Sequence, residues 1–580
     1  MLDKLEVARA LREIGMLLEV KGENPFKVRA YERGARALEE LQEELSVVVA
    51  PDRAGRLDRL TDLPGIGDAL AKKIVELHQT GRLPLLDRLR AELPPGILEL
   101  LQIPDLGARK IAALHAALGV ASIPDLEAAC LAGRVREVRG FGERSEQKIL
   151  EGIRRLQSTE PRHLLSEALE MGERILAHLR RSPAVERAEL AGSARRSRET
   201  VGDIDLVVAS RDPTAVSTHF LEFLRIAEVI GQGETKTSVR LGGGMQADLR
   251  VVPPEDYATL LHHLTGSKAH HVRLRGLARD KGLTLSEWGL IELAGGKKLP
   301  IASEAELYQR LGMAWIPPEL REDQGEIEAA LAGTLPQDLI RLEDLQGMVH
   351  CHTRWSDGRA TMEEMARAAE AMGMRYLTVT DHSATAAYAG GLDVDRLERQ
   401  WEELARVQEK VAVRLLRGTE ADILQDGSLD WPDAILERFD VIIASIHSRF
   451  SMDEEAMTQR LVRAMRQPVF KIWGHALGRI LLERPPFACR MEEVLDAAAE
   501  GRAAIEISGD PRRLELEPRF ARLASQRGIP FVISTDAHSP EGLANLRYGV
   551  GTARRGWVRR TEVLNSLPVE EFLRAVKPAR

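Results

Sequence analysis

The chain has 580 residues, of which 44% are hydrophobic and 29% are charged, with 81 Lys and Arg against 89 Asp and Glu. A chain of this length predicts about three to five folded units, and its apolar content excludes disorder as the main state. It contains no apolar run of about 18 residues, which excludes a membrane helix, and three cysteines cannot form a disulfide framework. We therefore expect a cytoplasmic protein with reduced cysteines.

Charge and histidine divide the chain near residue 315. Residues 1–315 carry 46 basic and 46 acidic residues, so residues 316–580 hold the entire net charge of −8. All six histidines of the second part follow short apolar runs, whereas the nine of the first part share no context. The segment from Trp315 to Asp323 is charged and contains two prolines, which cannot continue a helix. These features predict two chemistries joined by a linker at residues 316–345.

The first 160 residues show helical periodicity interrupted by three similar glycine-bearing turns. The turns are Leu63-Pro64-Gly65-Ile66-Gly67, Ile103-Pro104-Asp105-Leu106-Gly107 and Val138-Arg139-Gly140-Phe141-Gly142. After each turn we predict a helix with Lys or Arg near its start, where free N–H groups and positive charge bind phosphate. A single turn of this kind is more often a plain helix end, but three favour sequence-independent contacts with a nucleic-acid backbone.

The three turns resemble helix-hairpin-helix motifs, which bind DNA through its backbone. The second turn departs from the motif, with Asp105 in place of the usual glycine. The resemblance implies DNA contacts by Gly65, Gly67, Lys72, Lys73, Gly107, Arg109, Lys110, Gly140, Gly142 and Lys148.

Three aspartates lie on two predicted strands in the middle of the chain. Asp203 and Asp205 alternate with apolar residues, which places both carboxylates on one face of a strand. A second strand, from Met245 to Val252, offers Asp248. Each close pair of carboxylates repels by about 4 kcal/mol at an effective dielectric near 20, and a divalent metal ion relieves that repulsion.

The segment before these aspartates supplies groups for a triphosphate. Gly192-Ser193 predicts a tight turn, and Arg195 or Arg196 can balance phosphate charge. An isolated Asp-x-Asp is more often a solvated turn. Its combination with this turn, the arginines and Asp248 favours phosphoryl transfer with two metal ions.

The pattern from Gly192 to Asp205, followed by Asp248, resembles the nucleotidyltransferase palm of family X DNA polymerases, the family of DNA polymerase beta. Leu264-Thr265-Gly266-Ser267 is similar to the start of the thumb in that family. The resemblance implies that Asp203, Asp205 and Asp248 bind two Mg²⁺ or Mn²⁺ ions, and that Asp248 orients the primer hydroxyl. It implies that the incoming dNTP contacts Gly192, Ser193, Arg196, Arg250, Gly266 and Ser267.

Two departures from the family pattern concern the sugar and the DNA end. His263-Leu264 replaces an aromatic pair that stacks on the nucleotide sugar, so discrimination between deoxyribonucleotides and ribonucleotides stays open. Lys73 matches the lysine that forms a Schiff base in family members with 5′-deoxyribose phosphate lyase activity, but Ala69 replaces an accompanying lysine. Lys73 is therefore assigned either lyase chemistry or a plain phosphate contact.

From Gly347 onward, apolar runs alternate with helical segments, which predicts parallel strands covered by helices. Polar residues follow the C-terminal end of nearly every run, and a parallel barrel gathers its active site at that face. One such histidine is usually a satisfied strand-end residue. Six histidines together with carboxylates favour a site with two or three metal ions.

The order His-Cys-His, Thr-Asp-His-Ser, Gly-Thr-Glu-Ala-Asp, Ser-Ile-His-Ser, Gly-His and Thr-Asp-Ala-His resembles the PHP (polymerase and histidinol phosphatase) family of phosphoesterases, which form distorted seven-stranded barrels. All nine matching positions hold residues that can bind metal, which implies a working hydrolase with Mn²⁺ or Zn²⁺. The implied ligands are His350, His352, Asp357, His382, Glu420, His447, His475, Asp536 and His538.

The whole chain resembles the bacterial and archaeal PolX proteins, in which a PHP domain follows a family X polymerase. This implies a multidomain α/β protein with helical helix-hairpin-helix N-terminal and fingers domains, an α+β palm, a thumb and a distorted (β/α)7 barrel. The expected boundaries are 1–80 (N-terminal), 81–160 (fingers), 161–255 (palm), 256–315 (thumb), 316–345 (linker) and 346–580 (PHP). In the PHP domain, Arg547, Arg554 and Arg555 either contact DNA near the barrel mouth or belong to a solvated turn.

We therefore expect a monomeric, nucleoid-associated DNA repair enzyme. It would fill short gaps in gapped or nicked DNA with dNTPs and trim 3′ ends as a 3′–5′ exonuclease. One alternative is a PHP phosphoesterase that acts on DNA ends, with a palm that only binds DNA. A second alternative is a DNA-binding scaffold with vestigial sites. The complete aspartate triad and the complete ligand set favour the bifunctional enzyme.

Overall fold

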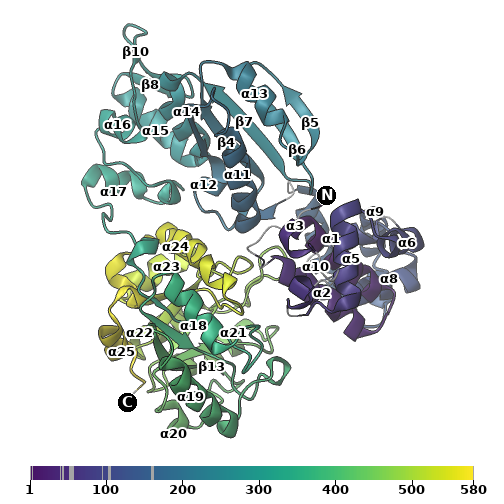
Figure 1. The fold of residues 1–580 in the computed structure, drawn as a ribbon. Helices are drawn as coiled ribbons and strands as arrows, with labels where there is room; N and C mark the ends of the chain where they lie inside the picture. Colours follow the sequence, from purple (N-terminus) through teal and green to yellow (C-terminus); the bar gives the residue numbers. More distant parts are fainter. Residues whose placement is uncertain are drawn as a thin grey trace. The chain divides into compact units, whose positions relative to one another are not determined.

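The computed structural model describes residues 2, 4–39, 41, 45–50, 58–63, 65–94, 96–101, 103, 106–158 and 162–578. The chain divides into two compact units, residues 1–160 and residues 161–580 (Figure 1). Within the described residues, no single helix is long and apolar enough to cross a membrane. The helices α8 (Ala108–Leu118) and α9 (Ile123–Leu131), bent by 69°, meet the length and composition criteria only as a pair.

The first unit consists of helices around two apolar cores. One core includes Leu11 and Ile74, and the other includes Ile111 and Leu126. Leu86 of α6 belongs to the first core, so this core extends past residue 80. Besides α8 and α9, the helices are α1 (Lys4–Val20), α2 (Pro25–Glu39), α3 (Leu45–Val48), α4 (Asp58–Thr61), α5 (Asp68–Thr80), α6 (Pro84–Glu92), α7 (Ile97–Leu100) and α10 (Glu143–Ser158).

The second unit begins with a five-stranded sheet in the order β2-β4-β7-β6-β5, in which β4 and β7 run parallel. Successive side chains of β4 point to opposite faces of this sheet. Ile204 and Leu206 pack with α11 and α13, whereas Val207 packs with α14. The elements are β1 (His163–Leu164), α11 (Leu165–Leu179), β2 (Arg187–Leu190), α12 (Gly192–Arg195), β3 (Thr200–Val201), β4 (Asp203–Ala209), α13 (Pro213–Leu221), β5 (Ile226–Gln232), β6 (Lys236–Leu241) and β7 (Gln246–Val252).

The segment predicted as the thumb combines helices with a three-stranded antiparallel sheet, β10-β9-β8. Leu274, Leu285 and Leu307 are among the residues that form its core. The elements are α14 (Tyr257–Thr265), α15 (Lys268–Asp280), β8 (Leu283–Ser286), β9 (Gly289–Glu292), β10 (Lys298–Leu299) and α16 (Glu304–Arg310).

Residues 316–345, predicted as a linker, are folded against the thumb. Ile316, Leu320 and Ile327 are buried in the thumb core, and α17 (Glu326–Ala332) belongs to this segment. Pro318 begins a short 3-10 helix, where its fixed φ is compatible with the first turn. The prolines do interrupt helix continuation, but the apolar residues around them pack in the thumb core, so this segment is folded in the structure.

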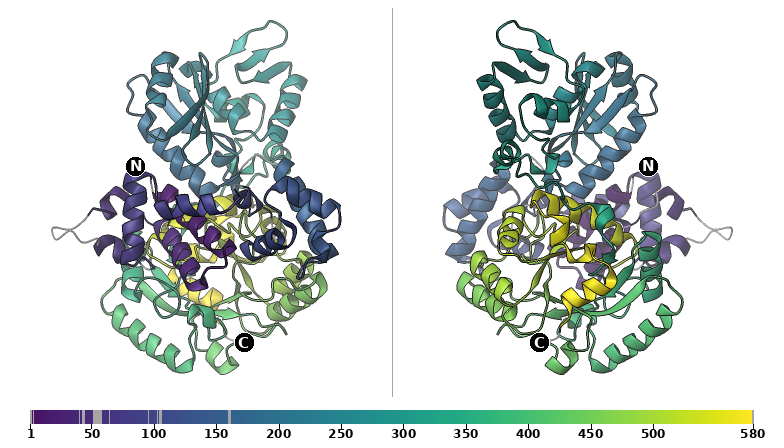
Figure 2. Two further views of the ribbon diagram at one scale, coloured as in Figure 1. Left: turned by 90° about the vertical axis from the view of Figure 1, so that its right-hand side faces the viewer. Right: turned by 90° about the vertical axis from the view of Figure 1, so that its left-hand side faces the viewer.

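Residues 347–534 form a sheet of seven parallel strands that follow one another in chain order. Helices of this region lie outside the strands (Figures 1 and 2). The strands are β11 (Gly347–Met348), β12 (Tyr376–Val379), β13 (Arg414–Asp422), β14 (Val441–Ser445), β15 (Ile472–Trp473), β16 (Ala504–Ser508) and β17 (Phe531–Ser534). The helices are α18 (Met362–Ala371), α19 (Val394–Gln408), α20 (Asp433–Leu436), α21 (Glu454–Met465), α22 (Met491–Glu500), α23 (Pro518–Gln526), α24 (Leu546–Arg555) and α25 (Val569–Val576).

The first and last strands meet and nearly close the sheet into a barrel. Beyond the strand ends, Cys351 and Ala537 form a parallel bridge. Near the other end, Asn565 is fully buried and joins both strands. Its amide nitrogen donates to the carbonyl oxygens of Gly347 and Ile533, at 2.9 and 2.7 Å, and its amide oxygen accepts from the N–H of Ile533 at 3.0 Å. The predicted seven-stranded barrel is confirmed.

We predict that Asn565→Asp destabilises the barrel by about 2–5 kcal/mol, because the carboxylate cannot donate to two buried carbonyl oxygens. The measurement is urea unfolding followed by tryptophan fluorescence, since five of the seven tryptophans lie in residues 347–580. Asn545→Asp is the matched control, because the Asn545 side chain makes no capping hydrogen bond at the start of α24. Equal stability of the two variants would contradict the role of Asn565.

Candidate active sites

The three aspartates of the palm converge at one end of β4 and β7. Asp205 lies directly opposite Asp248 in the parallel register of these strands. One carboxylate oxygen from each of Asp203, Asp205 and Asp248 lies within 4.8 Å of the other two. The alternation read from the sequence therefore brings all three carboxylates to one face, away from the helices α11 and α13.

Burial and mutual repulsion determine the charge of this cluster. Burial raises the pKa of Asp205 to about 7, and Asp203 and Asp248 add to the rise. Asp248 differs because the Lys236 Nζ lies 2.8 Å from its Oδ2 and Gln246 donates to its Oδ1 at 3.0 Å. Burial alone would raise the pKa of Asp248, but these contacts lower it. Lys236 on β6 is absent from the predicted set, because only the strand order brings it to this face.

Gly192 begins α12 beside the aspartates and leaves no room for a side chain. A Cβ atom at this position would lie 2.0 Å from Asp205 Oδ2, and the φ of +62° also favours glycine. Ser193 follows in the same short helix, and its carbonyl oxygen accepts from the N–H of Arg198 at 3.0 Å. This close packing places backbone rather than a side chain next to the carboxylates.

Arg195 and Arg196 have different partners. Arg195 donates to both carboxylate oxygens of Glu304, at 3.0 and 2.7 Å. Glu304 also accepts from the fully buried Arg321 at 2.6 Å. Burial alone would raise the pKa of Glu304, but Arg321 and Arg195 lower it to about 2. Arg195 is therefore engaged in a structural ion pair between palm and thumb.

Two of the remaining predicted nucleotide contacts, Gly266 and Ser267, lie beside Arg196 or adjoin a residue that does. Arg196 Nε donates to Glu322 at 3.0 Å, and a Cβ atom at Gly266 would lie 3.2 Å from Arg196 Nη1. Ser267 follows Gly266 and caps α15 by accepting from the helix backbone at 3.2 Å. Arg250 lies on β7, two residues beyond the strand aspartate. The predicted set is thus brought to one side of the palm sheet, with Glu322 as an additional partner.

We predict that Glu304→Gln lowers the melting temperature at pH 7, because it leaves the buried Arg321 without its counter-charge. The folded pKa of Glu304 lies below its usual value, so its stabilisation is complete above about pH 4.5 and is lost as pH falls toward 2. The difference in melting temperature between wild type and variant should therefore shrink over that range, as measured by calorimetry. Glu328→Gln, which breaks an exposed pair with Arg273, is the control. A difference that does not vary with pH would contradict this assignment.

All nine residues predicted as barrel ligands converge at the C-terminal ends of the strands. Glu420 of β13 lies at the centre. Its Oε2 lies 3.4 Å from His350 Nε2, 3.4 Å from His352 Nε2 and 3.1 Å from His382 Nδ1. Its Oε1 lies 2.8 Å from His475 Nε2 and 3.2 Å from His447 Nε2. The remaining three, Asp357, Asp536 and His538, complete the groups that follow.

Three overlapping groups of these residues have atoms within 4.8 Å of one another. The groups are His352, Asp357, His382 and His538; His350, His352, Glu420 and Asp536; and His382, Glu420 and His447. A buried polar atom normally has a hydrogen-bond partner. Four atoms that point into these groups are buried without one: His352 Nδ1, His382 Nδ1, Glu420 Oε2 and Asp536 Oδ1. Such unpaired donor atoms fit metal ions, and the imidazole and carboxylate ligands suit transition-metal ions.

A second layer of carboxylates orients the histidines. His350 Nδ1 lies 2.6 Å from Glu506 Oε1, and His447 Nδ1 bonds to Asp422, so both rings direct Nε2 toward the ligand cluster. Asp381 accepts from the backbone and hydroxyl of Thr353 at 2.7 and 2.6 Å. The predicted set omitted these carboxylates. A signal was present for Glu506, because its alternation with Ile505 and Ile507 places it on the inner face of β16.

We predict that Glu420→Gln lowers the content of bound divalent metal by more than one ion per chain, because Glu420 belongs to two of the three groups. The measurement is metal analysis by mass spectrometry after incubation with Mn²⁺ and gel filtration. Glu409→Gln, a change at an exposed position of the same domain, should leave the metal content unchanged. Unaltered metal content in Glu420→Gln would remove Glu420 from the site.

The described parts of the three glycine turns in the first unit share one geometry. A backbone hydrogen bond closes each turn: Ile66 to Leu63 at 3.0 Å, Leu106 to Ile103 at 3.2 Å, and Phe141 to Val138 at 2.9 Å. The helices α5, α8 and α10 start one residue after Gly67, Gly107 and Gly142. Their early residues Lys72, Arg109, Lys110 and Lys148 are exposed, whereas Asp105 lies outside the described residues.

Lys73 and His263 have partners within their own units. Lys73 Nζ donates to the hydroxyl of Tyr31 at 2.8 Å, and the pair packs as a cation over the ring. His263 Nδ1 lies 3.1 Å from His271 Nε2, with the two rings edge to face. Both residues thus have a defined position, and the chemistry assigned to Lys73 stays a prediction.

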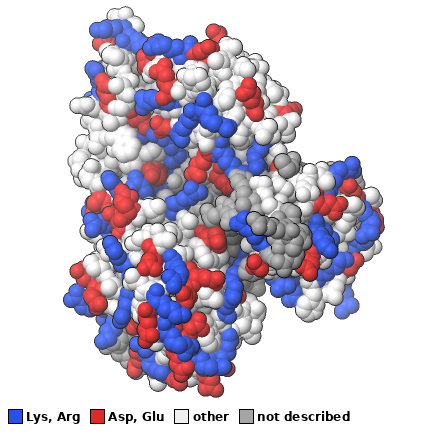
Figure 3. Space-filling view, viewed as in Figure 1, with Lys and Arg blue, Asp and Glu red and all other residues white. Residues whose placement is uncertain are grey.

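The C-terminal arginines offered as DNA contacts are engaged in ion pairs. Arg547 pairs with Glu173 at 3.0 Å, Arg554 with Glu319 at 2.7 Å and Arg555 with Glu199 at 2.7 Å. The alternative of a solvated turn is wrong, since these residues lie on helix α24. A DNA contact near the barrel mouth stays a prediction. Figure 3 shows basic and acidic side chains interspersed over the barrel surface in that view.

Comparison with known proteins accounts for this combination of sites. The DNA polymerase/3′-5′ exonuclease PolX of Bacillus subtilis (strain 168) is 36% identical over 577 residues, which cover 98% of this chain and 99% of that protein. The chain belongs to the PolX family. DNA polymerase lambda of Rattus norvegicus is 23% identical over 346 residues, covering 55% of this chain and 56% of that polymerase. A probable phosphatase of Thermoanaerobacter sp. (strain X514) is 29% identical over 249 residues, covering 39% of this chain and 94% of the phosphatase.

Family models match separate parts of this PolX chain. The helix-hairpin-helix domain matches residues 3–83, and the SAM-like helix-hairpin-helix tandem matches residues 97–155. The DNA polymerase beta thumb matches residues 260–322, and the PHP domain matches residues 349–509. The thumb match includes Arg321, in agreement with the packing of residues 316–322 in the thumb core. The predicted multidomain organisation is thereby confirmed, while the individual boundaries stay predictions.

Proposed function

We propose that this chain is a DNA repair polymerase that fills short gaps with dNTPs and also trims 3′ ends with a PHP-domain exonuclease. The observation that carries the proposal is the presence of two separate ligand clusters in one chain, an aspartate triad on β4 and β7 and the histidine-rich cluster around Glu420. The family relation to a DNA polymerase/3′-5′ exonuclease supports the same pairing of activities.

In the palm, each predicted residue has a defined task. Bound divalent ions supply the positive charge that phosphoryl transfer needs on the attacking and leaving oxygens. Asp203 and Asp205 would hold these ions, together with Asp248. Contacts with Lys236 and Gln246 keep Asp248 ionised, which suits it to accept a hydrogen bond from a primer hydroxyl. The primer 3′ oxygen then attacks the α-phosphorus of the dNTP, a new P–O bond forms, and pyrophosphate leaves.

The nucleotide would be held mainly by backbone and guanidinium groups. Gly192 and Ser193 provide backbone next to the carboxylates, and Arg196 provides the positive charge for the triphosphate. Gly266 adjoins Arg196, and Ser267 caps the start of α15. Arg250 extends the positive charge along β7. His263-Leu264 replaces the aromatic pair that the family resemblance implies, and His263 contacts His271, so we propose altered sugar discrimination at this position.

In the barrel, hydrolysis of a phosphodiester requires ligands held in fixed tautomers and a cation for the phosphate. Glu506 and Asp422 hold His350 and His447 so that Nε2 faces the cluster. The Nε of Arg513 lies 3.9 Å from Asp536 Oδ2 and is buried without a hydrogen-bond partner. Its nearer carboxylate is Asp510, whose Oδ2 lies 3.4 Å from the same nitrogen. We propose that Arg513, placed beside the ligand Asp536, binds the phosphate of a DNA end.

We further propose the finer properties that the sequence predicts. The palm would use two Mg²⁺ or Mn²⁺ ions, and the barrel would use two or three Mn²⁺ or Zn²⁺ ions, in keeping with their ligand types. The preferred substrate would be gapped or nicked DNA, bound by a monomer through the glycine turns of the first unit. Lys73 would contact a phosphate or act as a 5′-deoxyribose phosphate lyase. With such a DNA substrate, the enzyme would act in the cytoplasm, at the nucleoid.

The test uses a 5′-labelled primer on DNA with a one-nucleotide gap, with Mn²⁺ and with or without dNTPs. We predict that Asp203→Ala lowers primer extension at least about 100-fold and leaves degradation intact, because loss of a metal ligand removes several kcal/mol of transition-state stabilisation. His350→Ala should lower degradation to a similar extent and leave extension intact.

Asp280→Ala, at the end of α15, is the control and should retain both activities. Extension that survives in Asp203→Ala would favour the alternative in which the palm only binds DNA. Loss of both activities in either single variant would contradict two independent sites. If wild type shows neither activity after loading with Mn²⁺, the scaffold alternative would be correct.

A further inference from the structure

Helix α24 lies between the barrel and the palm and packs tightly on both. On the barrel side, a Cβ atom at Gly549 would lie 2.8 Å from Ile533 of β17 and 3.3 Å from the backbone of Gly509. On the palm side, a Cβ atom at Gly551 would lie 2.9 Å from the Ser197 hydroxyl. Gly549 and Gly551 are two residues apart, about half a helical turn, so they lie on opposite sides of α24. Both surfaces can therefore approach the helix backbone, and α24 couples the positions of the two domains.

Part of the palm surface that α24 contacts is the nucleotide loop, which we define as residues 192–199. Arg555 Nη1 lies 2.7 Å from Glu199 Oε2 and 3.5 Å from the carbonyl oxygen of Ser197. The side chains of Arg555 and Glu199 are only 6% and 16% exposed. Ser197 has a φ of +54°, a conformation that a serine rarely adopts and that needs support from its surroundings. The loop is thus held from outside the palm as well as from within.

The nucleotide loop also connects the residues proposed to bind the triphosphate with the strand that carries Asp203. Gly192 and Ser193 stand at its start, and Glu199 at its end precedes β3 and then Asp203. The carbonyl oxygen of Glu199 accepts from the N–H of Leu165 at 3.2 Å, which ties this end to α11. Any shift of Glu199 therefore moves both the turn that meets the nucleotide and the strand that carries the carboxylates.

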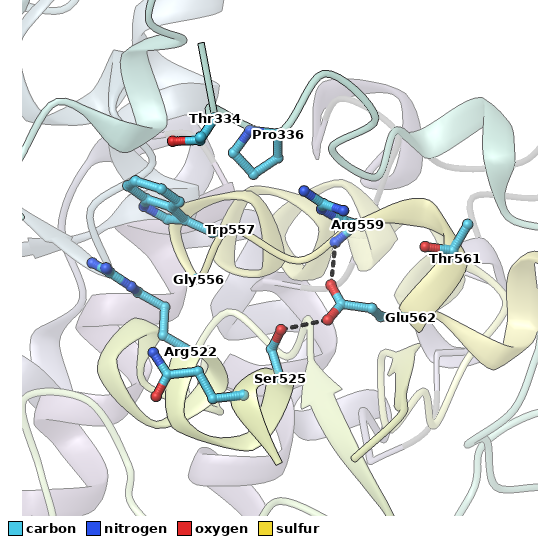
Figure 4. Close-up of a pocket in the computed structure, with 10 residues that line it drawn as sticks. Thr334, Pro336, Arg522, Ser525, Gly556, Trp557, Arg559, Thr561 and Glu562 are labelled. Atoms are coloured by element: carbon cyan, nitrogen blue, oxygen red, sulfur yellow. Dashed lines mark hydrogen bonds between the residues drawn. The ribbon is translucent and has the colours of Figure 1, made fainter. Parts of the chain in front are cut away.

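Other contacts of α24 extend the same interface. Tyr548 is buried in the palm core, and Arg554 pairs with Glu319 and donates to the carbonyl oxygen of Ile340 at 3.1 Å. Figure 4 shows the region beyond the C-terminal end of the helix, where the Arg522 guanidinium lies 4.5 Å from the centre of the Trp557 ring. Arg522 also donates to the carbonyl oxygen of Gln324 at 2.8 Å. The helix therefore lies within an extensive interface, and Arg555 is its one described ion pair with the nucleotide loop.

We propose that α24 of the barrel domain holds the nucleotide loop of the palm in its productive conformation, with Arg555 as the positioning residue. The barrel domain is then a structural part of the polymerase site in addition to having its own hydrolytic site. This inference rests on the proposed polymerase function of the palm. Arg555 contacts neither nucleotide nor metal ligand, and it acts only through Glu199 and Ser197.

The test compares Arg555→Met, Arg555→Lys and Glu199→Gln in the full-length protein. We expect Arg555→Met to lower kcat/KM for single-nucleotide addition about 10-fold to 100-fold, mainly through a higher KM for the dNTP, because small misplacements of binding groups have effects of this size. Degradation of single-stranded DNA by the barrel should not change. Arg555→Lys should recover part of the loss, since it retains the positive charge.

The double variant Arg555→Met/Glu199→Gln tests whether the two residues act through one ion pair or independently. If both residues act through one ion pair, the double variant should lose no more activity than the worse single variant. Additive losses would overturn the proposal. Arg547→Met is the matched control, because Arg547 belongs to the same helix but pairs with Glu173 of α11, away from the loop. It should extend primers as wild type does.

Hydrogen exchange gives a second readout that needs no polymerase activity. Backbone amides of residues 193–201 should exchange faster in Arg555→Met than in wild type or Arg547→Met, at equal melting temperature. Unchanged exchange together with unchanged KM would refute the proposal. A wild-type protein that adds no nucleotide would instead refute the proposed function of the palm, and the exchange result would still decide whether α24 holds the loop.

Discussion

Both sites depend on carboxylates that lie close together or are buried. Such carboxylates are unfavourable without positive charge nearby, because they repel one another and lose their hydration. In the palm, the parallel register sets Asp205 opposite Asp248, and burial raises the pKa of Asp205 to about 7. In the barrel, Glu420 lies among five histidines, which keep its pKa well below its usual value despite burial. Both arrangements need positive charge nearby. Lys236 in the palm and the histidines in the barrel supply part of it. In the barrel, the unpaired buried atoms show where metal ions would supply the rest.

Buried arginines join the domains that carry these sites. Arg195 connects the palm to the thumb through Glu304, and Arg555 connects the barrel to the palm through Glu199. The planar guanidinium group can bond to a carboxylate and a carbonyl oxygen at once, which a lysine cannot match in geometry. The same property allows arginine to bind phosphate. Sequence alone therefore could not tell which of Arg195 and Arg196 forms the ion pair with the thumb. The two neighbours differ only in which acidic partner the fold brings to them.

Much of the architecture follows from local pattern. Alternation along residues 203–208 identified the carboxylate face, and the strand-end histidines identified the open end of the barrel, because both signals depend on near neighbours in the sequence. Motif resemblance then named the two families. Lys236, Glu322 and Asp422 escaped prediction, since their place beside the sites depends on pairing between distant segments. The packing of Leu320 against the thumb escaped for the same reason, because the adjacent prolines gave the stronger local signal.

Asn565 has a consequence for how the barrel comes into being during synthesis. Chains fold broadly from the N-terminus as they are made, and contacts between distant residues form late. His350 and His352 are made early in the barrel, but the clamp that joins their strand to β17 exists only after residue 565. The helical unit, palm and thumb precede the barrel in synthesis, whereas α24, which supports the nucleotide loop, follows its last strand. A ribosome stalled before α24 would therefore present a palm without its outer support, beside a barrel that is still open along one seam.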